Sequence, residues 1–317
     1  MNAPALELDH VTKRYGDFLA VDDVSFSVPA GSIHGFLGPN GAGKTTTLRM
    51  ILEIIKPTHG SLRVLGHASA LEVRDRIGYL PEEKGLYKKM KAWAIIAYFA
   101  TLKGMSRRDA RQRALQLLDR YGLGAFADAR TDALSKGMGQ KVQMLASIVH
   151  EPELVILDEP FSGLDPVNQQ VMEEIIRDLA ARGHTVLFST HVMQHAERLC
   201  NHILLIARGR KLFDGTLAEA RRTLPRRVRI ESTDSIDPLR HIDGVLRIAP
   251  DISSSDGPDP DNSHWEIHLR EDADPQAILQ AAFEHHIRLR SFEQADPSLH
   301  DIFVHLVGPD AREAGRP

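Results

Sequence analysis

The chain has 317 residues and a formal net charge of −4, and its 42% hydrophobic and 26% charged residues are ordinary for a globular protein. The acidic balance gives no reason to expect nucleic-acid binding, and no apolar run approaches the roughly 20 residues that cross a bilayer. The single cysteine, Cys200, excludes an internal disulfide and fits a reducing cytosol. Met1 to His10 lack the apolar segment of a signal peptide.

The N-terminal part of the sequence is predicted to form strands followed by one helix. Leu6 to Leu8 and Val21 to Val28 alternate apolar and polar residues, as half-buried strands do. Ser32 to Leu37 is a short apolar run, typical of a buried strand, and helical spacing follows from about Thr46 to Ile55.

The segment between this strand and this helix reads Gly-Pro-Asn-Gly-Ala-Gly-Lys-Thr-Thr and matches the phosphate-loop pattern G-x-x-x-x-G-K-[ST]. Its glycines allow a tight turn that aims backbone N–H groups at phosphate oxygens. Lys44 adds a charge for the β- and γ-phosphates, the Thr45 hydroxyl can ligate Mg²⁺, and the helix N-terminus favours the same anion. The predicted phosphate site consists of Gly38, Pro39, Asn40, Gly41, Ala42, Gly43, Lys44, Thr45 and Thr46.

Strands and helices then alternate along the middle of the chain. The predicted elements are short strands at Leu62 to Leu65 and Arg76 to Leu80, a helical region from about Tyr87 to Tyr121, a helix from Ser135 to about His150, a buried strand at Leu154 to Leu157, a helix from about Val167 to Ala181 and a strand at Thr185 to Ser189. This order predicts an α/β core with a parallel sheet, interrupted by a helical insertion.

Two acids end the apolar run at Leu154 to Leu157. A buried strand delivers carboxylates to the edge of a parallel sheet, where the ligands of α/β proteins lie. Asp158 would hold Mg²⁺ directly or through water, and Glu159 would polarise the water that attacks the γ-phosphate. Two acids alone would equally suit a helix cap, but the phosphate loop upstream favours the functional interpretation.

The composition changes after Gly215, and a second, smaller domain is predicted there. The expected elements are strands at Arg227 to Glu231, Val245 to Ala249, His264 to Leu269 and Ile287 to Phe292, a short helix at Ile236 to Ile242, a loop at Asp251 to Ser263 and an amphipathic helix at Asp274 to His285. The order β-α-β-β-α-β is the split βαβ pattern, so we expect a small α+β domain of ferredoxin-like type.

The stretch Leu-Ser-Lys-Gly-Met-Gly-Gln-Lys from Leu134 to Lys141 resembles the LSGGQ signature of ATP-binding cassette (ABC) proteins. The resemblance covers about Leu6 to Gly215. Ser162, Gly163, Leu164 and Asp165 match the family's D-loop, and His191 matches its switch histidine. The resemblance implies the P-loop NTPase fold of an ABC cassette in the α/β class, with a mixed sheet core, an antiparallel β subdomain and the helical insertion at about 86–134.

The resemblance also implies how the residues act. Tyr15 would stack on adenine and Val21 could pack on the base, while His191 would bridge the γ-phosphate and Glu159 by donating from one nitrogen and accepting at the other. Two cassettes, copies of this chain or a paralogous pair, would dimerise head-to-tail around two MgATP, with the D-loop at the interface. Across that interface the signature would bind the partner's γ-phosphate; its residues here are Ser135, Lys136, Gly137 and Met138.

The chain departs from the family pattern at three positions. Glu82 takes the place of the usual Q-loop glutamine, and we expect it to sense the nucleotide and to ligate Mg²⁺. Lys136 replaces the usual first glycine of the signature and Met138 the usual glutamine, while Ser135 and Gly137 remain as phosphate donors. Lys136 would either add a cation near the partner's ATP or be a solvated surface lysine.

These departures, with Leu80 to Tyr87 and the tail Pro297 to Phe303, resemble ATPases of sodium- and drug-export type, NatA-like proteins among them. The resemblance implies an ATPase subunit that lies on the inner face of the cell membrane and drives a separate permease, which would dock on the helical insertion near Trp93, Tyr98 and Phe99. The expected domains are a cassette at 1–215, an accessory domain at 216–307 and a flexible tail at 308–317.

Two other functions remain open. A soluble ABC ATPase acting on nucleic acid or ribosomes is disfavoured by the single cassette and the acidic balance. A small-molecule kinase with a phosphate loop is disfavoured because Glu159 beside Asp158 suits the activation of water better than transfer to an acceptor.

Overall fold

The computed structural model describes residues 3–83, 85, 89–250, 264–270 and 272–308. The chain divides into two compact units, Met1–Leu217 and Ala218–Pro317, and each contains a hydrophobic cluster of its own. The predicted loop at Asp251 to Ser263 lies outside the described residues, and so does the predicted tail at 308–317 apart from Gly308.

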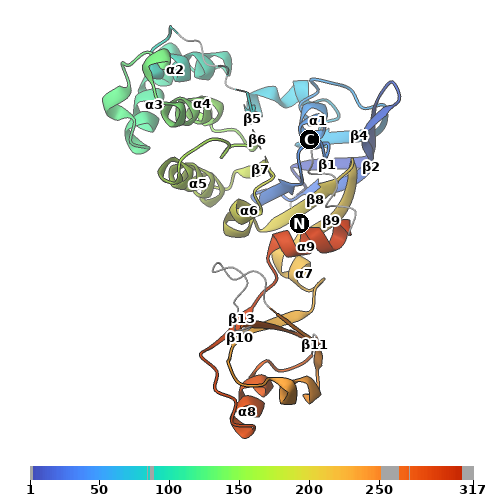
Figure 1. The fold of residues 1–317 in the computed structure, drawn as a ribbon. Coiled ribbons are helices and arrows are strands. Elements are labelled where there is room, and N and C mark those ends of the chain that lie inside the picture. The colour runs from blue at the N-terminus through green and yellow to red at the C-terminus, as the bar shows by residue number, and fades with distance from the viewer. Residues whose placement is uncertain (1–2, 84, 86–88, 251–263, 271, 309–317) are drawn as a thin grey trace. The chain divides into compact units, whose positions relative to one another are not determined.

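A six-stranded sheet lies at the centre of the first unit (Figure 1). Its order is β5-β6-β7-β3-β8-β9, and neighbouring strands are parallel except for the antiparallel edge pair β8 and β9. The strands are β3 (Ile33–Leu37), β5 (Ile77–Leu80), β6 (Leu154–Asp158), β7 (Thr185–Thr190), β8 (His202–Ala207) and β9 (Arg210–Thr216). Strands β3, β6 and β7 are buried along their whole length, which is why they read as continuous apolar runs.

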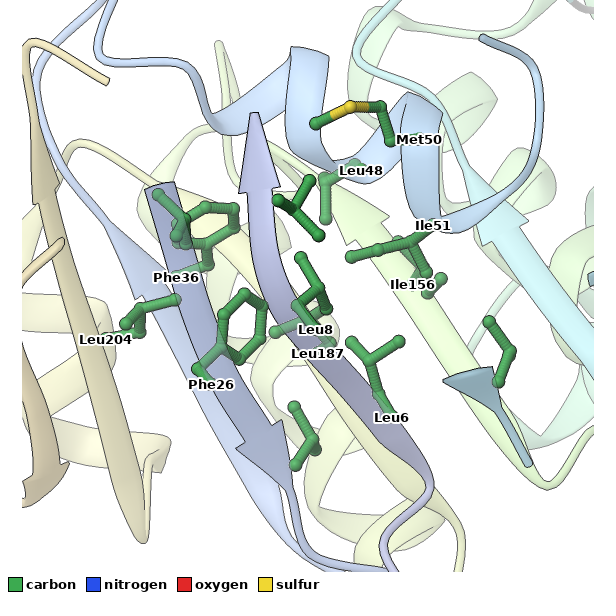
Figure 2. Packing of buried hydrophobic residues seen from close by; sticks show 14 of the residues in the cluster. Leu6, Leu8, Phe26, Phe36, Leu48, Met50, Ile51, Ile156, Leu187 and Leu204 are labelled. Atoms are coloured by element: carbon green, nitrogen blue, oxygen red, sulfur yellow. The ribbon is translucent and has the colours of Figure 1, made fainter. Parts of the chain in front are cut away.

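A smaller antiparallel sheet in the same unit has the order β2-β1-β4. It consists of β1 (Leu6–Tyr15), β2 (Phe18–Val28) and β4 (His59–Val64). Leu6, Leu8 and Phe26 of this sheet belong to the same core cluster as Leu48 of the helix after the phosphate loop and Ile156 of β6 (Figure 2). One core therefore joins both sheets to the helix that carries the predicted phosphate site.

The predicted helical region of the insertion contains two helices, α2 (Ala92–Leu102) and α3 (Arg107–Arg120). Gly104, at φ 92°, follows the first helix, and the Ser106 side chain caps the second by accepting from the Asp109 N–H. The helices are α1 (Lys44–Ile51), α2 (Ala92–Leu102), α3 (Arg107–Arg120), α4 (Lys136–Ile148), α5 (Pro166–Ala181) and α6 (Met193–Leu199), with the 3₁₀ helices η1 (Ala70–Arg76), η2 (Gly124–Phe126) and η3 (Thr131–Ala133) and, at the boundary of the units, α7 (Leu217–Arg221). None of the helices in the described ranges has the length and apolarity that crossing a membrane requires.

The second unit contains a four-stranded antiparallel sheet of order β11-β12-β10-β13. Its elements are β10 (Arg226–Glu231), η4 (Asp237–His241), β11 (Val245–Pro250), β12 (His264–Leu269), α8 (Gln276–Glu284), β13 (Ser291–Ala295) and α9 (Leu299–Val307). The strand order and pairing are those of the predicted split βαβ pattern, with η4 in place of the first helix. The last strand begins at Ser291, whereas the apolar residues from Ile287 predicted an earlier start. Ile287 is buried just after α8 and packs in the core before the strand begins.

Candidate active site

The phosphate loop joins the buried strand β3 to α1, and two of its glycines are required by close contacts. A β-carbon on Gly43 would lie 2.6 Å from the Ala20 carbonyl oxygen, and one on Gly38 would lie 2.2 Å from that of Ile206. Gly43 also has φ 105°, in the left-handed region that other residues avoid. The backbone therefore reaches the start of α1 by a path that only glycine can follow.

Lys44 is the first residue of α1, and its side chain is almost fully buried. Its ammonium donates to the carbonyl oxygens of Gly38 at 2.8 Å and Pro39 at 3.1 Å, and it lies 3.5 Å from Oε1 of Glu159. The lysine thus links the phosphate loop to the carboxylate of Glu159, the residue that follows β6. A buried cation at this place can contact a phosphate group and the carboxylate of Glu159 together.

Asp158 lies at the end of β6 beside the first turn of α1. The hydroxyl of Thr45 is 3.4 Å from Oδ1 of Asp158, and the hydroxyl of Ser189 donates to the same oxygen at 2.5 Å. The other oxygen, Oδ2, is buried and has no hydrogen-bond partner among the described residues. An unpaired buried carboxylate oxygen beside a threonine hydroxyl fits a hard divalent cation such as Mg²⁺, which prefers oxygen ligands.

Glu159 follows Asp158 in the left-handed region at φ 49°, an uncommon conformation for a residue with a side chain. Its N–H lies within hydrogen-bond distance of the Ser189 hydroxyl at 3.1 Å and of the Ser189 carbonyl oxygen at 3.2 Å. This backbone turn points the side chain back toward Lys44 and His191. Functional sites often contain such strained residues.

The ring of His191 faces the carboxylate of Glu159, with Nδ1 3.0 Å from both carboxylate oxygens. A carboxylate only accepts hydrogen bonds, so Nδ1 carries the proton. The bridge from His191 to a γ-phosphate, which the sequence predicts, stays a prediction.

A cavity of about 300 Å³ lies over the phosphate loop, and Glu82 and Glu159 are on its wall. Phe18 also lines it and is 65% exposed, whereas the sequence predicts Tyr15 and Val21 as the residues that contact the base. Tyr15 is 48% exposed, so part of its ring surface is accessible. The Lys13 ammonium lies over the ring. Val21 is fully buried in the core cluster and leaves no surface for a base, so its predicted role is wrong.

The signature residues lie at the start of α4. The structure describes all of them, and none lines this cavity: Ser135, Lys136, Gly137 and Met138. Ser135 caps the helix by accepting from the Met138 N–H at 3.2 Å, which leaves its hydroxyl proton available to an anion. Gly137 is buried against Asn168, whose amide nitrogen would be 2.5 Å from a β-carbon at 137. Within one chain, the signature residues therefore do not share the cavity of the phosphate loop.

The D-loop lies beside the signature. Asp165 caps α5 by accepting from the Asn168 N–H at 2.9 Å, and Leu164 is buried. Gly163, at φ 67°, lies against the side chain of Lys136, because a β-carbon there would be 2.3 Å from Nζ. The lysine that departs from the family pattern thus covers a glycine of its own D-loop.

Three residues of the site were missed by sequence reasoning. Ser189 holds Asp158 and the Glu159 backbone, and its place just before Thr190 and His191 was the available signal. Phe18 offers only a weak sequence signal, an aromatic residue shortly after Gly16, and its exposure is known only from the structure. Gln140 lies within the stretch from Leu134 to Lys141 that resembles the signature, but nothing local reveals that its side chain donates to the Pro160 carbonyl oxygen.

Comparison with known families assigns both units. Residues 21–162 match the family described as ABC transporter, and residues 215–307 match the C-terminal domain of DrrA1-3-like ATP-binding proteins.

Whole-chain comparisons agree with these matches. The chain is 39% identical over 304 residues to an uncharacterized ABC transporter ATP-binding protein, YhaQ, of Bacillus subtilis, covering 96% of this chain and 98% of that protein. It is 39% identical over 218 residues to a Nod factor export ATP-binding protein of Burkholderia orbicola, covering 68% and 72% of the two chains. A solved ATP-binding subunit of an ABC transporter is similar with a TM-score of 0.64 and 32% identity, over 69% of this chain and 92% of that one.

Proposed function

Because this chain belongs to the ATP-binding proteins of ABC transporters, a family that binds and hydrolyses ATP, we propose that it is the ATP-hydrolysing subunit of an exporter. The observation that carries the proposal is the convergence of Lys44 and His191 on Glu159, at 3.5 Å and 3.0 Å. A phosphate-binding cation and a switch histidine on one carboxylate suit the activation of water next to a γ-phosphate. They suit the transfer of that phosphate to another acceptor less well.

The residues of the chain would divide the work as follows. The phosphate loop and Lys44 bind the β- and γ-phosphates, Tyr15 and Phe18 offer ring surfaces to the base, and Glu159 takes the proton of the attacking water. Thr45 and Asp158 would hold Mg²⁺, and Glu82 at the cavity wall could reach the same ion. When bound, Mg²⁺ neutralises part of the charge of the triphosphate.

We propose further that two copies of the chain assemble head-to-tail around two ATP molecules. The position of the signature supports this arrangement, because Ser135 and Gly137 do not line the cavity over their own chain's phosphate loop and would be available to a γ-phosphate held by another chain. A two-fold interface would bring each signature to the partner's phosphate loop, with Ser162 to Asp165 between them.

The membrane partner would be a separate permease that contacts the helical insertion. A groove of about 920 Å³ runs between α2 and α3, lined by Trp93, Tyr98 and Leu115 together with Arg107, Arg108 and Arg111. Trp93 is held by the Arg111 guanidinium 4.9 Å above its ring and by a hydrogen bond to Asp128. The export direction is supported by the Nod factor export relatives. The chain would then work at the cytoplasmic face of the membrane, with residues 216–307 as an accessory domain.

The test is co-expression with the membrane protein encoded beside this gene. We expect the two chains to purify together, two copies of this chain per complex, and ATPase activity to rise on association. Tyr98→Ala should weaken the complex, whereas Phe126→Ala, an exposed aromatic residue outside the groove, should not. A chain that never associates with a membrane protein, and whose deletion leaves all export phenotypes intact, is not an exporter subunit.

A further inference from the structure

Gln140 is a buried amide that reaches from the signature helix α4 to the segment after β6. Its side chain is 6% exposed, and its Nε2 donates to the carbonyl oxygen of Pro160 at 2.7 Å. The amide orientation is fixed, because a carbonyl oxygen only accepts. The remaining oxygen, Oε1, is buried without a partner among the described residues. An apolar side chain would avoid that cost, so packing alone does not explain an amide at this position.

The acceptor is the residue next to the catalytic acid. Pro160 has no N–H, so its carbonyl is the one backbone group through which a hydrogen bond can hold it. Glu159 itself has the strained φ of 49°. A small shift of the Pro160 peptide would therefore change the direction of the Glu159 carboxylate relative to Lys44 and His191.

The same segment is held from its other side by α6. The ring of Phe161 stacks on His195 with 4.0 Å between the ring centroids and meets Phe188 edge-on. Helix α6 begins two residues after His191. Pro160 and Phe161 thus lie between the signature helix and the helix that follows the switch histidine.

The start of α4 has two further contacts with the region after β6. Lys136 lies against Gly163 of the D-loop, and Gly137 lies against Asn168, which Asp165 fixes at the start of α5. The contact of the buried Gly137 with Asn168 therefore links the first turn of α4 to the start of α5, next to the D-loop. Among these contacts, the hydrogen bond of Gln140 ends on the residue adjoining Glu159.

We infer that Gln140 is a positioning residue that couples the two nucleotide sites of the dimer. When the signature binds the γ-phosphate of the partner's ATP, the shift of α4 passes through Gln140 and Pro160 to the carboxylate of Glu159 in the same chain. Hydrolysis at one site then depends on occupancy of the other. The inference rests on the proposed function, because the signature acts on the nucleotide of a second copy.

The test compares Gln140→Leu with Ser147→Ala. Leucine has a similar size, cannot donate and removes the unpaired oxygen, so the variant should fold. Ser147 is buried on the same helix and bonds only locally, to the Met144 carbonyl oxygen and more weakly to its sulfur, so its variant controls for the loss of a buried hydrogen bond. We expect Gln140→Leu to lower kcat about ten-fold, as a slightly misplaced catalytic group does, with the KM for ATP unchanged. The Hill coefficient for ATP should fall to about 1, while Ser147→Ala stays near the wild type.

A background of Glu159→Gln separates this inference from the proposed function. The double variant with Gln140→Leu should still form the ATP-bound dimer, because its signature residues are intact. Loss of that dimer only in the double variant would show that Gln140 serves assembly and would overturn the inference. So would a Gln140→Leu enzyme with the kcat and Hill coefficient of the control. Should leucine prevent folding, Gln140→Met is measured in the same way. No hydrolysis in the wild type, or no dimer in Glu159→Gln alone, would contradict the proposed function.

Discussion

The ammonium of Lys44 lies 3.5 Å from Oε1 of Glu159, and both side chains are almost fully buried. In such surroundings each charge depends on the other, because an unpaired buried ion is costly. The lysine also holds two carbonyl oxygens of the phosphate loop. The phosphate loop and the Glu159 carboxylate therefore form one electrostatic unit, and their proposed roles can be separated only by substitutions that keep the shape of the side chain.

Glu159→Gln keeps that shape and removes the base. We expect kcat to fall about 10²- to 10⁴-fold, the usual effect of losing a general base, while ATP binding persists. The variant should elute as a dimer in size-exclusion chromatography with ATP. Glu174→Gln, on the exposed side of α5, should keep wild-type activity and remain free of a trapped dimer. Hydrolysis at the normal rate by Glu159→Gln would remove Glu159 from this role.

Ser189→Ala tests the support of the proposed cation site. The variant loses the 2.5 Å hydrogen bond to Asp158 and the contact with the Glu159 N–H. Loss of such a supporting hydrogen bond costs about 10- to 100-fold in metal affinity, so the Mg²⁺ concentration for half-maximal ATPase activity should rise by that factor. Ser147→Ala is the control, because its hydroxyl bonds within α4. An unchanged Mg²⁺ dependence would show that Asp158 does not need Ser189.

Gly43→Ala and Gly41→Ala separate steric exclusion from backbone strain. A methyl group at 43 would lie 2.6 Å from the Ala20 carbonyl oxygen, whereas the space around 41 is open, at φ 77°. We expect Gly41→Ala to cost about 1 kcal/mol and to retain ATP binding. Gly43→Ala should displace the loop and abolish binding, as measured by titration calorimetry. Equal affinities in the two variants would contradict this distinction.

Because His34 is buried, we expect the protein to lose stability in acid. His34 is fully buried without hydrogen-bond partners among the described residues and stacks on His202 at 5.9 Å. Burial, and secondarily the charge of His202, lower the pKa of His34 from 6.5 to about 4. The unfolded chain therefore binds the proton first, so stability is complete above about pH 6.5 and declines as the pH falls toward 4. At pH 5 the loss is about 2 kcal/mol.

The measurement is urea unfolding near pH 7.5 and pH 5, with His34→Leu as the comparison. The variant should lose less stability between these pH values than the wild type, by about the amount assigned to His34. His150, whose pKa burial also lowers to about 4, remains in both proteins and accounts for a shared part of the decline. Equal losses in the two proteins would show that His34 is not responsible.

Local sequence signals predicted much of this molecule, because they depend on contacts close in the chain. The phosphate loop follows from glycine geometry, and the buried strand β6 follows from its continuous apolar run. The split βαβ order of the second unit was also confirmed by the pairing of its strands. The predicted start of β13 was too early, because the apolar residue Ile287 packs in the core before the strand begins.

Contacts between distant residues could not be predicted. The hydrogen bond from Gln140 to Pro160 joins residues that no periodicity relates, and the burial of Val21 depends on the close approach of Gly43 and its neighbours. Ser189 likewise gains its role only because β6 and β7 are adjacent and place Asp158 opposite it. Most of the residues proposed to bind nucleotide were visible in the sequence, whereas most of the residues that support them became visible only in the fold.

The backbone conformation of Gly163 restricts this position more than the lysine beside it does. Its φ of 67° is strained for any residue with a side chain, whatever space is available. The Nζ of Lys136 is the end of a flexible side chain and can move aside, so the lysine adds little to that restriction. Relatives are therefore expected to keep glycine at the position of Gly163 whether they carry lysine or glycine at the position of Lys136.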